Sequence, residues 1–119
     1  MQMNIQGHGI ELTSPLSQYA TKKLEKLQEF YKNIIKMMVV LDVRKNKDIK
    51  NSHVADVSIW VSGKKVVHAS EVGEDMYAAI DLVYEELKRQ LVRHKEKHMK
   101  ETRRVAEKLK ERQRNTTIM

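Results

Sequence analysis

The chain has 119 residues, which is enough for one domain with a single hydrophobic core. It contains no cysteine, which excludes disulfide frameworks and zinc–thiolate sites, and no apolar run of about 18 residues that could span a membrane. The net charge of +7 is uneven, because residues 88–119 carry twelve Lys and Arg against four acids while residues 1–87 are almost neutral. This gradient favours a polyanionic partner, although a solvated basic tail is the alternative.

The first elements are a short strand and a helix. Alternating residues at 3–6 predict the strand. Ser14 and Pro15 then predict a helix start with Ser14 as the cap, and the helix covers residues 15–31. One apolar stripe marks its buried side, formed by Leu16, Ala20, Leu24, Leu27 and Tyr31. Lys22 and Lys26 lie on the opposite side, and Lys23 lies at the flank.

Three further strands are predicted over residues 37–44, 55–61 and 65–72. The clearest period-two run is 55–61, in which small and branched apolar residues alternate with Asp56, Ser58 and Trp60. A polar loop over 46–51 precedes it, and a hairpin turn at Ser62-Gly63 follows it.

A long helix is predicted from about Gly73 to Arg104. Its apolar row consists of Met76, Ile80, Val83, Leu87 and Leu91. A basic row of Arg89, Arg93, Lys97, Lys100 and Arg104 lies on another side of the helix. After Arg104 too few apolar residues remain for packing, so we expect frayed helix or disorder, and we divide the chain into a domain over 1–100 and a basic tail over 101–119.

The order strand, helix, three strands, helix predicts an α+β fold. Short connections make the last three strands an antiparallel meander, whereas the first helix is a crossover between two parallel strands. The two helices cover one face of the four-stranded mixed sheet. The result is a two-layer βαβββα sandwich with a more polar, partly exposed second face.

The basic rows on the two helices are the main functional signal. Helices that expose Lys and Arg can line a groove that follows phosphates. The alternative is an ordinary solvated face in which Glu85 pairs with Arg89 and Glu96 with Lys100. We favour phosphate binding, because the apolar and basic rows keep separate sides of the helix.

Other chemistry is weakly supported. His94 and His98 have a spacing that a helical metal site can use, but no Cys or matched carboxylate accompanies them, so we expect no metal and no cofactor. Trp60 lies on the predicted open sheet face and Tyr77 is predicted to be a partly buried anchor, so base stacking is less favoured than recognition of phosphates. No catalytic motif, and hence no small-molecule substrate, is indicated.

The residues carry a family resemblance over positions 1 to about 98. The most specific segments are residues 75–81 (DMYAAID) and residues 89–91 (RQL), eight positions later. Further matching segments are residues 3–5, 11–13, 53–57, 68–70 and 94–95. In these segments the chain resembles the ribosome hibernation-promoting factor and ribosome-associated inhibitor A family.

The resemblance implies a fold similar to a double-stranded-RNA-binding domain and a role in silencing idle ribosomes at the tRNA and mRNA region of the small subunit. It also implies which residues contact rRNA: Lys23, Lys26, Arg89, Arg93 and Lys95. Lys22, Lys88, Lys97 and Lys100 are added from the helical rows. Glu86 stands where relatives commonly carry Lys, and Lys88 is a candidate replacement for that contact.

The sequence therefore predicts a non-enzymatic, cytoplasmic, ribosome-associated inhibitor of translation that is monomeric away from the ribosome. Whether it promotes or blocks pairing of ribosomes is left open. The alternative is a protein-interaction module that pairs through its long C-terminal helix. The apolar row gives way to charges beyond Leu91, which argues against a coiled-coil seam.

Overall fold

The computed structural model describes residues 1–44, 52–63 and 65–117, and the side chains of these residues as far as Lys97. The predicted loop over 46–51 lies outside the described residues. The elements in chain order are β1 (Gln2–His8), α1 (Ser14–Glu25), the 3₁₀ helix η1 (Lys26–Glu29), β2 (Ile34–Val43), β3 (His53–Val61), β4 (Lys65–Gly73) and α2 (Met76–Thr117).

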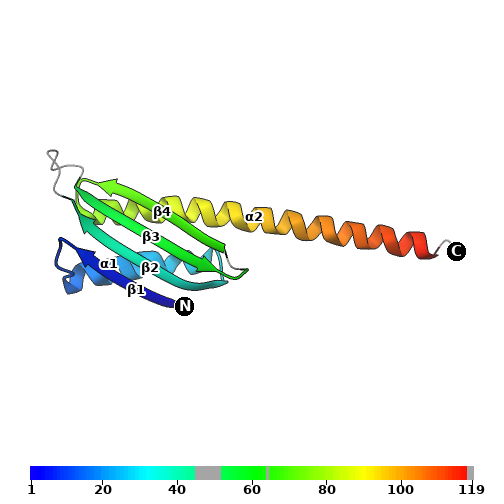
Figure 1. Cartoon of the computed structure of the whole chain (residues 1–119), viewed down its shortest axis with the longest axis horizontal. Helices are drawn as coiled ribbons and strands as arrows, with labels where there is room; N and C mark the ends of the chain where they lie inside the picture. The colour runs from blue at the N-terminus through cyan, green and yellow to red at the C-terminus, as the bar shows by residue number, and fades with distance from the viewer. Residues whose placement is uncertain (45–51, 64, 118–119) are drawn as a thin grey trace.

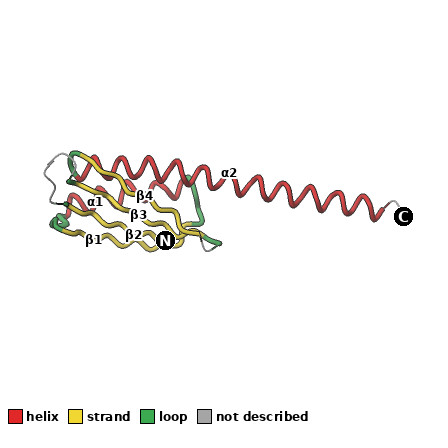
Figure 2. The backbone as a smooth tube through the Cα atoms, turned by 45° about the horizontal axis from the view of Figure 1, so that its top comes forward, coloured by secondary structure: helices red, strands yellow, loops and turns green. Residues whose placement is uncertain are grey.

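The four strands form one sheet in the order β1-β2-β3-β4. β1 pairs with β2 in parallel, and β2, β3 and β4 form an antiparallel meander. Both helices lie behind the sheet in Figure 1, which looks onto the open face, and Figure 2 shows the two layers from another side. The predicted α+β sandwich is confirmed.

The core lies between the sheet and the helices. Alternate residues of β2 and β3 point into it, so that Met37, Val39, Leu41, Val57 and Ile59 are fully buried. The predicted apolar row of α2 packs on them, and all of its members are buried: Met76, Ile80, Val83, Leu87 and Leu91. The core contains Leu16, Ala20, Leu24 and Leu27 of the first helical segment as well.

The predicted start and end of the first helix need correction. Thr13, not Ser14, is the N-cap, because Thr13 has an extended backbone and its hydroxyl accepts the N–H of Leu16 at 3.4 Å. The α-helix ends at Glu25 instead of continuing to residue 31. The tighter η1 turn follows, and the N–H groups of Phe30 and Tyr31 both donate to the carbonyl of Leu27 at 3.1 Å.

The second helix begins where β4 passes very close to it. A Cβ placed on Gly73 would lie 2.4 Å from the amide nitrogen of Ala79, so only glycine fits there. The carboxylate of Asp75 then accepts the N–H of Ala78 at 2.7 Å and caps the helix start. α2 continues beyond Arg104 to Thr117, so the structure has helix where the sequence left helix and disorder open. Its second half extends well past the sheet (Figures 1 and 2).

Candidate nucleic-acid interface

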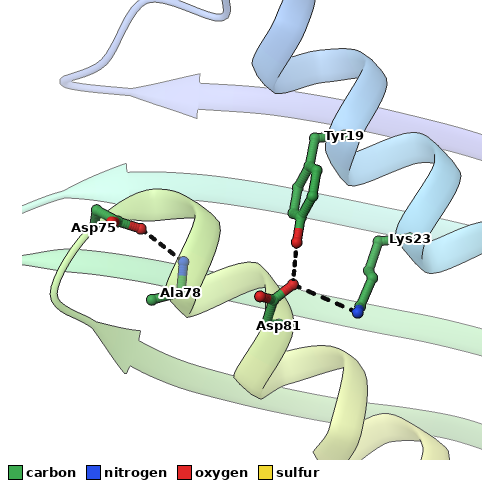
Figure 3. A network of polar contacts seen from close by, with 5 residues as sticks. All are labelled: Tyr19, Lys23, Asp75, Ala78 and Asp81. Atoms are coloured by element: carbon green, nitrogen blue, oxygen red, sulfur yellow. Dashed lines mark hydrogen bonds and ion pairs between the residues drawn. The ribbon is translucent and has the colours of Figure 1, made fainter.

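The candidate site consists of cations on two helices, and its geometry depends on how α1 is fixed against α2. The hydroxyl of Tyr19 in α1 donates to Asp81 in α2 over 2.5 Å (Figure 3). The rings of Tyr19 and Tyr77 meet edge to face, with centroids 5.0 Å apart. Tyr77 is 42% exposed, so it is more open than the partly buried anchor that the sequence predicted. The hydrogen bond to Asp81 raises the pKa of Tyr19 above its usual value, and burial adds to the shift.

Lys23 belongs to the same contact between the helices. Its ammonium lies 3.6 Å from the Asp81 carboxylate (Figure 3) and 4.9 Å from the centroid of the Tyr84 ring. Only 27% of its side chain is exposed. Lys22 and Lys26, by contrast, are exposed on the outside. The predicted position of Lys23 at the flank of the helix, apart from Lys22 and Lys26, agrees with this arrangement, and the structure adds that this flank faces α2.

Lys88 of α2 also lies against an aromatic ring, farther along the contact between the two helical segments. Its ammonium lies 4.8 Å from the centroid of the Phe30 ring, just after η1. We call the side of α2 that carries Asp81, Tyr84 and Lys88 the α1 flank. Lys95 is exposed and follows Lys88 by seven residues, which is two helical turns, so it continues this flank outward.

Arg89 points outward from α2, with 65% of its side chain exposed. It pairs with Glu86 at 2.5 Å, not with Glu85 as the solvated-face alternative expected. Glu86 also accepts a hydrogen bond from Gln90 at 3.0 Å, so its carboxylate joins Arg89 and Gln90. Hydrogen bonding from Gln90 lowers the pKa of Glu86 below its usual range, and the charge of Arg89 adds to the effect.

Arg93 and Lys97 lie on the side of α2 opposite the α1 flank, next to the edge strand β4. They contribute to an open hollow of about 330 Å³ between the helix and the strand. The hollow is lined by Val66, Val67, Glu86, Gln90, Arg93, His94 and Lys97. We call the side of α2 that carries Glu86, Gln90, Arg93 and Lys97 the β4 flank. Arg93 and Lys97 make no ion pair with any of the described residues.

The remaining predicted residues are placed less fully. His94 is half-buried, with its ring 5.5 Å from that of Tyr31, whereas the side chains of His98 and Lys100 lie outside the described residues. Because the side chain of Lys100 is not described, the predicted Glu96–Lys100 pair also lies outside the described residues. Within the described part of the chain, no group of three or more His, Cys, Asp or Glu could hold a metal ion. Nor is any described helix both long and apolar enough to cross a membrane.

Sequence reasoning missed the two residues that organise the α1 flank, Tyr19 and Asp81. Tyr19 precedes Lys23 by four residues, which puts both on one side of α1. Asp81 directly follows the buried Ile80. An acid at the margin of the apolar row was therefore the available sign that Asp81 contacts another element. Their contact joins two helices that are distant in the sequence, and no local pattern indicates it.

A two-layer α+β domain whose helices expose Lys and Arg on their outer sides is a candidate nucleic-acid-binding domain. Comparison with known proteins makes the class specific. Residues 3–99 match the family described as Sigma 54 modulation protein / S30EA ribosomal protein, and the chain belongs to this family. The resemblance seen in the sequence is thus confirmed.

Relatives with a named role cover most of the chain. The ribosome hibernation promoting factor of Salmonella typhimurium is 43% identical over 97 residues, which span 82% of this chain and 96% of that protein. The protein of the same name from Escherichia coli K12 is 41% identical over the same shares. The ribosome hibernation promotion factor of Picosynechococcus is 37% identical, and the match spans 93% of this chain but 58% of that protein.

Two solved structures have the same fold. A ribosomal subunit interface protein from Coxiella burnetii is 22% identical, with a TM-score of 0.70 over 80% of this chain and 98% of that one. The N-terminal domain of Thermus thermophilus Protein Y is 26% identical, with a TM-score of 0.68 over 79% of this chain and 99% of that one. The described fold is therefore the fold of these two solved structures.

Proposed function

We propose that the protein is a ribosome hibernation factor that binds rRNA of the small subunit and silences idle ribosomes. The observation that carries the proposal is the outer helical surface, where Lys22, Lys26, Arg89, Arg93 and Lys97 are all exposed. The names of the relatives that match over nearly their whole length support a ribosomal partner.

The proposed mechanism is occupancy without catalysis. Lys and Arg side chains on the outer surface contact backbone phosphates, and each contact releases condensed counterions from the RNA. Arg offers two parallel hydrogen bonds to a phosphate, whereas Lys supplies a point charge on a flexible stem, so a mixed set tolerates an irregular RNA backbone. With rRNA held in this way in the cytoplasm, the domain excludes tRNA and mRNA from the small subunit.

The site residues contribute unequally to this proposal. Direct phosphate contacts come from the exposed cations, which are Lys22, Lys26, Arg89 and Lys95 together with Arg93 and Lys97 of the β4 flank. Lys23 and Lys88 are already placed against aromatic rings of the protein, so we assign them a smaller direct share. Lys100 completes the basic row by sequence position alone.

The test is reversal of charge on α2. The double variant Arg89→Glu/Arg93→Glu should lose cosedimentation with small subunits at physiological salt, while its thermal unfolding stays close to that of the wild type. The single variant Arg93→Glu is measured as well. Its matched control is Arg44→Glu, which alters the charge equally at an exposed residue after β2. Undiminished binding by the double variant would refute the assignment of this face.

The role of residues 101–119 is tested separately. Sucrose-gradient profiles of ribosomes with the full chain and with a chain ending at Lys100 show whether the paired-ribosome peak changes. A gain or a loss of that peak assigns the tail a role in pairing. The alternative function is a protein-interaction module in which α2 pairs with another helix. A monomer at micromolar concentration in sedimentation experiments would count against it, because it would exclude pairing with a second copy.

A further inference from the structure

The sheet face opposite the helices carries an aromatic and basic corner that the proposed function does not use. The strand register places Gln2, Lys36, Trp60 and Val66 in one row across all four strands. This row lies near the end of the sheet from which α2 projects, on the face turned toward the viewer in Figure 1. We call these four residues the Trp60 row.

The Trp60 row and the residues beside it offer the side-chain types that bind nucleotides in other proteins. The ammonium of Lys36 lies 5.2 Å from the centroid of the Trp60 ring. A hollow of about 390 Å³ adjoins Lys36 and is lined by Gln2, Met3 and Asn4 on the edge strand β1. An indole face can stack on a base, an ammonium can contact a phosphate, and side-chain amides can both donate to and accept from base edges.

The position of the row is continuous with the proposed rRNA-binding surface. Val66 is the register partner of Trp60, and it also lines the hollow of the β4 flank together with Arg93 and Lys97. Val66 is 53% exposed, so the two sites meet around the edge of β4. An RNA strand that contacts Arg93 and Lys97 can therefore pass around the edge of β4 and reach Trp60 without crossing the core.

We propose that Trp60 is a stacking platform for an unpaired RNA nucleotide, with Lys36 as its phosphate contact. The choice of RNA as the ligand rests on the proposed function, whereas the site itself lies on the other face of the sheet. In the unbound protein, Lys36 rests on the ring. On binding, the ammonium gives up this contact to reach the phosphate, and the base takes the ring face that Lys36 covered.

The experiment uses the fluorescence of Trp60, which is the one tryptophan of the chain. The full chain is titrated with a single-stranded octaadenylate RNA and, in parallel, with a blunt RNA duplex. Saturable quenching by the single strand is expected, with little quenching by the duplex, because paired bases have no open face to offer. Unchanged emission at saturating single strand, or equal quenching by the duplex, would overturn the proposal.

Variants separate stacking from charge. Lys36→Gln should lower the slope of log affinity against log salt by about 0.7 for the single strand, as expected for one lost phosphate contact. Trp60→Leu, followed by anisotropy of a labelled oligonucleotide, should weaken binding roughly 5-fold or more, and Trp60→Phe should fall between Leu and the wild type. Wild-type affinity in Trp60→Leu would refute stacking.

A last arm distinguishes this site from the helical surface. In the Arg89→Glu/Arg93→Glu background, ribosome cosedimentation should be lost while quenching by the single strand persists at low salt. Loss of the quenching in that background would show that RNA does not bind Trp60 by itself. It would overturn the proposal that Trp60 forms a site separate from the helical surface. Equal quenching by polyglutamate would show a general anion response and would overturn the assignment to RNA.

Discussion

The two flanks of α2 both carry cations, but they use them differently. At the α1 flank, Lys88 lies against the Phe30 ring, and Lys23 of the facing helix α1 lies against the Tyr84 ring and pairs with Asp81. On the β4 flank, Arg93 and Lys97 line an open hollow. A cation that is engaged within the protein must give up its contacts to reach a phosphate. The β4 flank is therefore the better prepared for RNA, and the α1 flank is the better prepared to fix the helices.

The largest expected effect comes from disturbing both flanks at once through Gly73. A methyl group at Gly73 would lie 2.4 Å from the Ala79 amide nitrogen and 2.9 Å from the carbonyl carbon of Ala78. Because backbone atoms cannot turn aside, Gly73→Ala must shift α2 from the sheet. We expect a loss of roughly 1–3 kcal/mol or more in the free energy of unfolding, measured by urea denaturation.

Gly63→Ala is the matched control for that change. Gly63 has a φ of +91° but nothing lies within 4 Å of the added methyl group. It should cost only about 1 kcal/mol, from backbone strain alone. If the two variants were equally stable, the close approach of β4 to α2 would not constrain the helix.

The next effect tests the hydrogen bond that joins the helices on the α1 flank. Tyr19→Phe removes the hydroxyl that donates to Asp81 and should lower the free energy of unfolding by about 1–2 kcal/mol. The pKa of Tyr19 is raised above 10.0 in the folded state. The stabilisation is therefore complete below pH 10 and is lost as the pH rises through the higher folded value.

Urea denaturation of the wild type and Tyr19→Phe between neutral and strongly alkaline pH measures this directly. The difference in stability between the two proteins should be constant up to about pH 10 and then shrink. Tyr77→Phe is the control, because it keeps the ring that touches Tyr19. A wild-type advantage that does not change at high pH would contradict the role of the Tyr19 hydroxyl.

The layers of the fold could be predicted because burial repeats with the period of each element. In β3, Val57 and Ile59 are buried while Ser58 and Trp60 are not, and this contrast is visible in the sequence. The end of α1 could not be predicted in this way. Leu27 keeps the helical spacing whether the last turn is α or 3₁₀, so the apolar stripe continues past the change at Lys26.

The candidate site was predictable as a set of cations but not in its division into two flanks. Spacing identified Lys22 and Lys23 on α1, but their different environments depend on Asp81 and Tyr84 from the other helix. The partner of Arg89 was also mistaken, because Glu85 and Glu86 are both within reach along the helix. Local spacing gives the candidates, and tertiary packing selects among them.

A smaller effect should distinguish the neighbouring lysines of α1. Lys23→Met removes a partly exposed ion pair and a contact with the Tyr84 ring, so it should lower the free energy of unfolding by about 1 kcal/mol. Its effect on the salt dependence of RNA binding should be slight. Lys22→Met should do the reverse, leaving stability nearly unchanged and reducing the slope of log affinity against log salt by about 0.7 for a single strand and about 0.9 for a duplex.

Thermal unfolding and RNA titrations at several salt concentrations supply the two measurements for this pair. Because both changes remove one lysine charge from the same helix, the total charge is matched. A reduced salt slope in Lys23→Met with unchanged stability would place Lys23 among the phosphate contacts. The division between the flanks would then fail at its best-defined residue.

The smallest effect concerns Glu86, the acid of the β4 flank. Glu86→Gln releases Arg89 from its ion pair and removes a negative charge beside Arg93, so RNA affinity should rise a few-fold at low salt and the salt slope should steepen. The pKa of Glu86 is lowered from 4.5 in the folded state. Its stabilising contacts are thus present above that value and are lost as the pH falls through the lower folded value. The wild type should accordingly lose its stability advantage over Glu86→Gln in acid. A lower RNA affinity of Glu86→Gln than of the wild type would contradict the prediction and show that Glu86 instead orients Arg89 for binding.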